Sequence, residues 1–329
     1  MNILKRYAFA LALPLAATLA TPAAFGAEPA KFPGKLVTLV VPFTPTSGSD
    51  IIARIIAPKL SALWGQPVIV DNRPGASGNI GTHRVATAAP DGHTLLMAIN
   101  TFTMTPSLYN KLPYDPVAGF APVAKLAEAS YVMAVNPSVP VTDIASLIAY
   151  IKKNPGKVNY GTPGNGTPQH LAMELFKKQY GLNTMHVPYK GLQGAVTDLI
   201  GGQVQMMMTT VQSVRSFGDA GKVRMIAVTG AARSPLAPNV PTFKEQGVTA
   251  MDNIEAWYAV LAPAGTPPEL VKRLNHDFIS VLNQKDVKDQ LTQLGMTVRS
   301  SSPEELGALV KAEIPRWKQV IAAAGITAN

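Results

Sequence analysis

The sequence contains no cysteine, and its only long apolar run lies at the start of the chain. Without cysteine the chain forms no disulfide, holds no cysteine-ligated metal and lacks the residue to which bacterial lipid anchors are attached. No segment after residue 26 approaches the roughly 18 continuous apolar residues that a membrane-spanning helix requires. We therefore expect the mature chain to be free in solution.

Motifs typical of catalysis and of metal binding are also missing. No GxSxG nucleophile elbow occurs, although the turn at 75–78 (GASG) resembles one, and no nucleophile–base pair is found. The histidines have neither HExxH nor another metal-ligand spacing; they are His83, His93, His170, His186 and His276. We therefore predict that the protein is not an enzyme and carries no metal and no cofactor.

The chain is basic, with a formal charge of +9 from 29 Lys and Arg against 20 Asp and Glu. These basic residues are scattered, with no basic stripe and no interleaved aromatic residues, so nucleic-acid binding is not expected. A mild positive field that steers small anions is the better interpretation.

The first 26 residues have the three parts of a secretory signal. Lys5 and Arg6 are followed by an apolar run of about 14 residues and then by small residues that end in Ala24-Phe25-Gly26. This pattern predicts a signal peptide over 1–26, cleaved near Gly26, and export to the periplasm. The alternative is a retained anchor, for which the run is short.

Short apolar runs alternate with amphipathic stretches along the rest of the chain. Strands are expected over 36–41, 68–70, 94–98, 131–135, 204–208 and 225–228, and helices over 50–63, 79–88, 142–153, 168–179, 192–200 and 212–220. The last 65 or so residues are mostly helical, with helix-start signals at Thr266 and Ser302. The alternation predicts an α/β fold with helices on both faces of parallel sheets, and the length suffices for two lobes.

Two β–α loops are candidate anion sites. In 41–54 a strand runs into small and hydroxyl residues before a helix that starts at Ser49 or Asp50; the alternative is an ordinary turn with Asp50 as N-cap. In 159–171 a strand runs into a loop with three glycines, with Thr167 as N-cap and Pro168 at the first helical position. A two-lobed protein could aim both helix ends into one cleft.

Two other segments are weaker candidates. In 186–191 Tyr189 could line a pocket and Lys190 could pair with a carboxylate, although an exposed strand end explains Lys190 as well. Thr209 follows the strand 204–208 at the carboxyl end where open α/β sheets place ligands, and loop capping is its alternative role.

Taken in order, these motifs resemble the Bug family, the TctC-type periplasmic solute-binding proteins of tripartite tricarboxylate transporters. The resemblance covers essentially the whole mature chain. It is carried by 41–43 (VPF), 65–76 (GQPVIVDNRPGA), 89–95 (APDGHTL), 164–167 with His170-Leu171, 186–191 (HVPYKG), Pro241-Thr242, Trp257-Tyr258 and 261–267 (LAPAGTP).

The resemblance implies a type II periplasmic-binding-protein fold, with two α/β lobes and a ligand cleft between them. Lobe 1 would comprise 27–128 and 229–329 and lobe 2 would comprise 129–228, with crossings near 128–133 and 226–229. It also implies a monomer that captures a small organic acid, such as a dicarboxylate, tricarboxylate or aromatic acid, and delivers it to a two-component membrane permease. A sensor that presents the same ligand to a receptor is the alternative.

We expect the ligand contacts to come from loop backbone and hydroxyl groups. The candidate residues are Phe43, Thr46, Ser47, Gly48, Ser49, Asn100, Thr101, Thr162, Gly164, Asn165, Gly166, Thr167, Tyr189 and Thr209.

The chain departs from the family pattern at two places. Relatives usually have Pro-Gly-Gly in the first loop, where this chain has Thr46 and Ser47 after Pro45. Many relatives also have an acidic residue where Thr209 stands. Because Thr209 offers no negative charge to a ligand ammonium group, a dicarboxylate or aromatic acid fits better than an amino acid.

Overall fold

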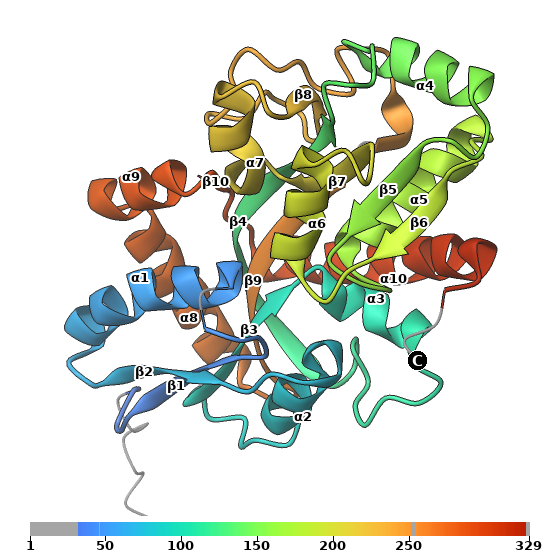
Figure 1. Cartoon of the computed structure of the whole chain (residues 1–329). Coiled ribbons are helices and arrows are strands. Elements are labelled where there is room, and N and C mark those ends of the chain that lie inside the picture. Colours follow the sequence, from blue (N-terminus) through green and yellow to red (C-terminus); the bar gives the residue numbers. More distant parts are fainter. Residues whose placement is uncertain (1–31, 46, 252–253, 327–329) are drawn as a thin grey trace, which may run out of the picture. The chain divides into compact units, whose positions relative to one another are not determined.

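The computed structural model describes residues 32–45, 47–251 and 254–326. The expected signal peptide and Thr46 lie outside the described residues. The described strands form one ten-stranded sheet in the order β2-β1-β3-β9-β4-β7-β5-β6, and β8 and β10 also pair with β4. The sheet divides into two groups of strands that share β4 (Figure 1).

The first group consists of β1 (Val37–Val41), β2 (Val68–Asn72), β3 (Thr94–Ile99), β9 (Glu255–Pro263), β10 (Met296–Val298) and the first part of β4 (Phe120–Val135). Strand β1 pairs in parallel with β2 and β3, while β9 runs antiparallel to β3 and β4. Apolar residues bury both faces of these strands: Leu39 and Val41 enter one core, and Val40 between them enters another.

Helices cover both faces of this group, as expected for a sheet with parallel strands. Helices α1 (Gly48–Trp64), α8 (Pro268–Leu282) and α9 (Lys285–Gln293) supply one core, and α2 (Asn79–Ala86), α10 (Pro303–Ala324) and the start of α3 (Thr101–Leu108) supply the other. Of the helices in the described ranges, none is long and apolar enough to cross a bilayer.

The second group consists of β5 (Asn159–Thr162), β6 (Met185–Pro188), β7 (Met206–Thr210), β8 (Arg224–Val228) and the end of β4. Met206 and Met208 face helices α4 (Ile144–Lys153) and α5 (Pro168–Tyr180), whereas Met207 faces α6 (Leu192–Ile200) and α7 (Val211–Asp219). This alternation follows from the two-residue period of a strand.

Strand β4 connects the two groups (Figure 1). Its partner changes between Ser130, which pairs with Glu255 of β9, and Tyr131, which pairs with Thr210 of β7. After the expected second crossing at 226–229, Val228 bridges to Thr242, and β9 begins at Glu255. The division of the sequence into two lobes at 128 and 229 remains a prediction.

Candidate ligand-binding site

The first candidate loop ends at the N-terminus of α1. The helix begins at Gly48 with Ser47 as N-cap, and the Ser47 side chain makes no capping hydrogen bond. Its hydroxyl instead lies 3.4 Å from the Ser49 hydroxyl. The N–H groups of Gly48 and Ser49 have no acceptor among the described residues, as is usual for the first turn of a helix. This helix end therefore presents backbone donors to an anion.

Asp50 is not the N-cap that an ordinary turn would use. It lies within the first turn, 2% exposed, and accepts hydrogen bonds from Arg54 Nε at 3.0 Å and Asn72 Nδ2 at 2.9 Å. Asn72 Nδ2 also lies within 3.1 Å of the Phe43 carbonyl oxygen, to which it donates. The end of β2 thus fixes the shape of the first loop, and the Arg54 charge is paired within the protein.

Tyr258 of β9 lies against Gly48. A Cβ atom added at Gly48 would lie 2.8 Å from two carbons of the Tyr258 ring, so only glycine fits there without displacement of the ring. The Tyr258 hydroxyl has no hydrogen-bond partner in the described part of the chain, and burial raises the pKa of this group to about 12. The hydroxyl is therefore a protonated donor beside the N–H groups of Gly48 and Ser49.

Asn100 and Thr101 follow β3 beside Tyr258, because Ile99 pairs with Tyr258 in the sheet. Asn100 is buried, and its Nδ2 lies 3.4 Å from the Tyr131 hydroxyl and 3.3 Å from the Glu255 carbonyl oxygen. Its side chain therefore connects the end of β3 with the start of β9 and with Tyr131 inside β4.

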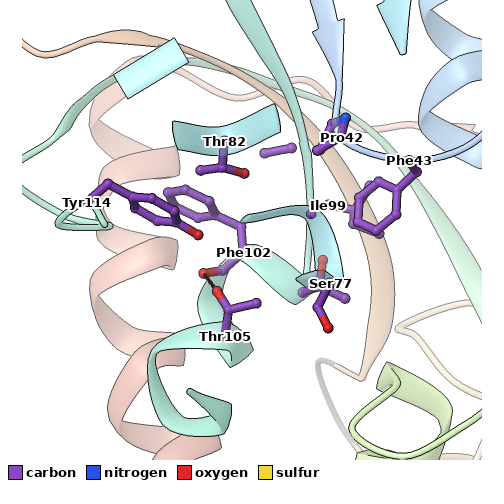
Figure 2. Close-up of a pocket in the computed structure, with 11 residues that line it drawn as sticks. Pro42, Phe43, Ser77, Thr82, Ile99, Phe102, Thr105 and Tyr114 are labelled. Carbon is purple, nitrogen blue, oxygen red and sulfur yellow. Dashed lines mark hydrogen bonds between the residues drawn. The ribbon is translucent and has the colours of Figure 1, made fainter. Parts of the chain in front are cut away.

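Thr101 and Phe43 line a small cavity of about 10 Å³, close to Ser77 (Figure 2). Ser77 lies in a turn whose residues 75–78 all have positive φ, with 47° at Ala76 and 55° at Ser77. Two successive non-glycine residues in this region represent backbone strain, which is typical of functional sites. The Ser77 hydroxyl is 2.9 Å from the Tyr109 hydroxyl.

The second loop, 162–167, is held by hydrogen bonds of its own. Thr167 is the N-cap of α5: its hydroxyl accepts from His170 N at 3.4 Å and donates to the Gly164 carbonyl at 2.8 Å. Gly164 N donates to the Thr162 hydroxyl at 3.3 Å, and Gly166 N donates to His170 Nδ1 at 3.1 Å. The predicted cap is confirmed, but these two glycine N–H groups are already bonded, which leaves Asn165 N as the donor without a partner among the described residues.

Asn165 lines a polar pocket of about 360 Å³ together with side chains of α5 and β6 and the chain segment 324–326. This is a different cavity from the one beside Phe43 and Thr101. The loop nevertheless lies against α3: a Cβ at Gly166 would lie 3.2 Å from Leu108, at the end of this helix.

The last two candidates, Tyr189 and Thr209, are surrounded by other parts of the protein. The Tyr189 hydroxyl donates to Asp198 at 2.6 Å, and its ring packs against Gly161 and Gly194. Burial and the bond to Asp198 raise the pKa of Tyr189 to about 12. Thr209 is fully buried on β7, and its hydroxyl has no partner in the region that the structure describes. The ligand-binding roles of all these residues remain predictions.

The sequence alone did not identify Tyr258, Ser77 or the hydrogen bond between Asn72 and Asp50 as parts of the site. The sequence holds one signal for Tyr258, a phenol within the apolar run that follows Glu255, and Ser77 lies in the GASG turn. Their contacts in the folded chain show that they meet the first loop: Tyr258 lies at Gly48, Ser77 lines a cavity with Phe43, and Asn72 donates to Asp50.

Similar solved structures define the class of protein. An R. palustris protein solved with adipate has a TM-score of 0.77 and 37% sequence identity, covering 90% of this chain and 99% of its own. MatC from Rhodopseudomonas palustris, solved with bound malate, has a TM-score of 0.73 and 33% identity, covering 88% and 100%. The α/β periplasmic-binding-protein fold is thus confirmed, and the chain is a solute-binding protein rather than an enzyme.

The sequence identifies the family within that class. Residues 52–326 match the family described as "Tripartite tricarboxylate transporter family receptor" (TctC). A Pseudomonas sp. protein from the tcbD-tcbE intergenic region is 38% identical over 298 residues, 91% of this chain and 89% of that protein. BugT of Bordetella pertussis is 33% identical over 296 residues, 89% of this chain and 90% of BugT. The chain belongs to this TctC-type Bug family.

Proposed function

We propose that this protein captures a small carboxylic acid in the periplasm and delivers it to the two-component membrane permease of a tripartite tricarboxylate transporter. The observation that carries the proposal is the concentration of neutral donors at the start of α1. The N–H groups of Gly48 and Ser49 and the Tyr258 hydroxyl lie together there, without an acceptor among the described residues. Such donors at a positive helix end suit a carboxylate.

The second loop would complete the site when the lobes close on the ligand. Asn165 N is its donor without a partner among the described residues. Gly166 lies against the end of α3, and the first residues of this helix line a cavity with Phe43 of the first loop. Closure would exclude water, which strengthens the interaction of fixed N–H dipoles with the carboxylate. Ser47, Thr101 and Thr162 are the hydroxyl groups that we assign to this site.

A dicarboxylate, tricarboxylate or aromatic acid is the ligand class that we favour. The relatives solved with adipate and malate support an acid with more than one carboxylate. Thr209 supplies no negative charge at the end of β7, so nothing at that position would compensate a ligand ammonium group. Export rests on the signal pattern in 1–26, and its cleavage near Gly26 is part of the proposal.

Calorimetry on protein purified from periplasm without refolding tests the binding function. The panel comprises adipate, malate, citrate, benzoate and aspartate, with glucose and Mg²⁺ as non-acid probes. We expect one or more of the acids to bind with a Kd of about 10 μM or lower, equivalent to roughly −7 kcal/mol. Binding of glucose or Mg²⁺ with no binding of any acid would overturn the proposal.

Delivery to a permease requires a separate test in cells. Deleting the gene should abolish uptake of the bound acid and leave induction of its transport genes intact. Normal uptake in the deletion strain contradicts a transport role, and lost induction favours the sensor.

A further inference from the structure

Two stacked imidazole rings are hydrogen-bonded to the second loop. The ring centroids of His170 on α5 and His186 on β6 are 3.8 Å apart, and their planes differ by 16°. The Tyr160 ring continues the stack at 5.0 Å from His186. His170 is 5% exposed. None of these aromatic groups belongs to the ligand-contacting residues proposed above.

Each imidazole holds one end of the loop. His170 Nδ1 accepts the Gly166 N–H at 3.1 Å, and His186 Nε2 lies 2.6 Å from the Thr162 hydroxyl. An N–H donor at Gly166 requires a bare acceptor nitrogen, so His170 is neutral and carries its proton on Nε2. A protonated His170 would place two donors face to face and break this bond.

The surroundings keep both rings neutral near pH 7. Burial lowers the pKa of His170, and burial together with the neighbouring His170 lowers the pKa of His186 to about 4. Glu174 and Lys177 on α5 also face the pair, and they form a 2.8 Å ion pair with each other. Tyr160 donates its hydroxyl to Glu174, and the segment 324–326 closes the pocket with no titratable side chain.

We infer that His170 and His186 are positioning residues for the ligand loop: the neutral stacked pair fixes 162–167 in its binding shape, and acidification releases it. The inference rests on the proposed function of this loop. It makes ligand release sensitive to the acidity of the periplasm through residues that do not touch the ligand. The loop itself contains no titratable side chain.

The Gly166 amide reports directly on the inferred bond, with or without a ligand. In full-length protein labelled with ¹⁵N-glycine, its hydrogen exchange at fixed pH should accelerate roughly tenfold or more in His170→Phe, which keeps a ring but has no acceptor. His170→Asn should restore most of the protection, because its Oδ1 is an acceptor near the position of Nδ1. Equal exchange in wild type and His170→Phe would overturn the inference.

Affinity for adipate and malate, measured from pH 7.5 to 4.5, tests the consequence for binding. Titration of the ligand carboxyls affects all variants alike, so the difference between variants isolates the imidazoles. We expect wild type to lose roughly threefold to tenfold more affinity than His170→Asn over this range, with exposed His276→Asn as a control that follows wild type. A wild-type profile parallel to that of His170→Asn contradicts the inference. If neither acid binds any variant, the proposed function is in question, and the Gly166 exchange still decides the positioning role.

Discussion

Tyr258 is a phenol in a strand that is apolar after Glu255, and its hydroxyl has no partner among the described residues. The Tyr258 side chain is 7% exposed, and its hydroxyl is open to solvent or to a ligand. In this protein the group lies at Gly48, where the N–H groups of Gly48 and Ser49 also have no acceptor among the described residues. We therefore assign it a role in ligand contact rather than in stability.

Replacing Tyr258 with Phe separates these two roles. The variant should bind the preferred acid roughly tenfold more weakly, since a hydrogen bond to a charged group is lost, and its stability should change by less than about 0.5 kcal/mol. Calorimetry and urea unfolding measure the two effects. Tyr180→Phe, on α5, is the matched control and should change neither. A Tyr258→Phe protein with wild-type affinity contradicts the assignment.

The structure also changes which residue of the first loop matters. The sequence pattern drew attention to Thr46 and Ser47, which replace glycines of the family pattern, whereas the observed steric requirement falls on Gly48. That requirement could not be predicted, because it depends on a tyrosine more than 200 residues away in β9. The alternative role of Asp50 as N-cap is also wrong. Ser47 is the N-cap, and Asp50 is bound by Asn72, a partner from another strand that the local sequence does not reveal.

At the scale of elements, the N-terminus of α1 is positioned by close packing on β9. Gly48→Ala should displace the Tyr258 ring, because the added methyl would lie 2.8 Å from its carbons. We expect a loss of about 1–3 kcal/mol in unfolding free energy from overpacking, together with weaker acid binding. Urea unfolding and calorimetry measure both.

Gly307→Ala is the matched control, because its added methyl touches only Pro122 at 3.4 Å. On α10 it should be neutral or stabilising by up to about 1 kcal/mol. If Gly48→Ala unfolds and binds like this control, the close packing of α1 on β9 is not required.

Helix α10 is attached to the sheet through a buried carboxyl group. Glu313 accepts hydrogen bonds from Trp257 Nε1 at 3.0 Å and from the Thr103 hydroxyl at 2.7 Å, and burial raises its pKa. Glu313→Leu should lower the unfolding free energy by about 1–3 kcal/mol, since the buried Trp257 N–H loses its acceptor. Glu313→Gln keeps an acceptor and removes the cost of a buried charge, so it should be more stable than Glu313→Leu in urea unfolding at pH 7. The opposite order would contradict this account.

Element types followed well from the sequence, because strands and helices in this fold carry a strong hydrophobic period. The strands expected over 36–41 and 94–98 are β1 and β3, and the caps at Thr167 and Ser302 are confirmed, since a capping pattern is local. The glycine loop was harder to interpret. Its backbone donors at Gly164 and Gly166 are taken by Thr162 and His170, a pairing that glycine spacing cannot reveal.

A Gly166→Val substitution would not test anion access alone. Its φ is +69°, and an added Cβ would lie 3.2 Å from Leu108. A valine there would strain the backbone and press on α3, so weaker binding would not distinguish a blocked ligand from a distorted loop.

At the scale of the whole molecule, the buried histidine pair couples stability to pH. The folded-state pKa of His170 lies below its ordinary value, and that of His186 lies at about 4. In the unfolded chain both would titrate near the ordinary value of about 6.5. Between these values the unfolded chain binds more protons than the folded chain, so the unfolding free energy falls as the pH is lowered through this window.

Other shifted groups act outside this window or in the opposite direction. Hydrogen bonds lower the pKa of Asp115 and Asp143, so their contribution is lost only below about pH 4. The raised pKa of Glu313 has the reverse sign: its contribution is present at low pH and is lost as the pH rises through the folded-state value. The two histidines should therefore account for most of the change in unfolding free energy between about pH 6.5 and pH 4.5.

Urea midpoints at pH 7.5, 6.5, 5.5 and 4.5 test this balance. Wild type should lose stability on the order of 1–2 kcal/mol across the acidic part of the range, a figure that allows for the partial exposure of His186. His186→Gln keeps a polar group near the Thr162 hydroxyl and cannot titrate, so its stability should fall less steeply with decreasing pH. The control His276→Asn should follow wild type. Because the pair holds the second loop through Thr162 and Gly166, acid affinity should begin to fall at a lower pH than stability: affinity falls through the folded-state pKa values, and stability already falls from the unfolded-state value. A wild-type slope equal to that of His186→Gln would show that the acid sensitivity arises elsewhere in the molecule.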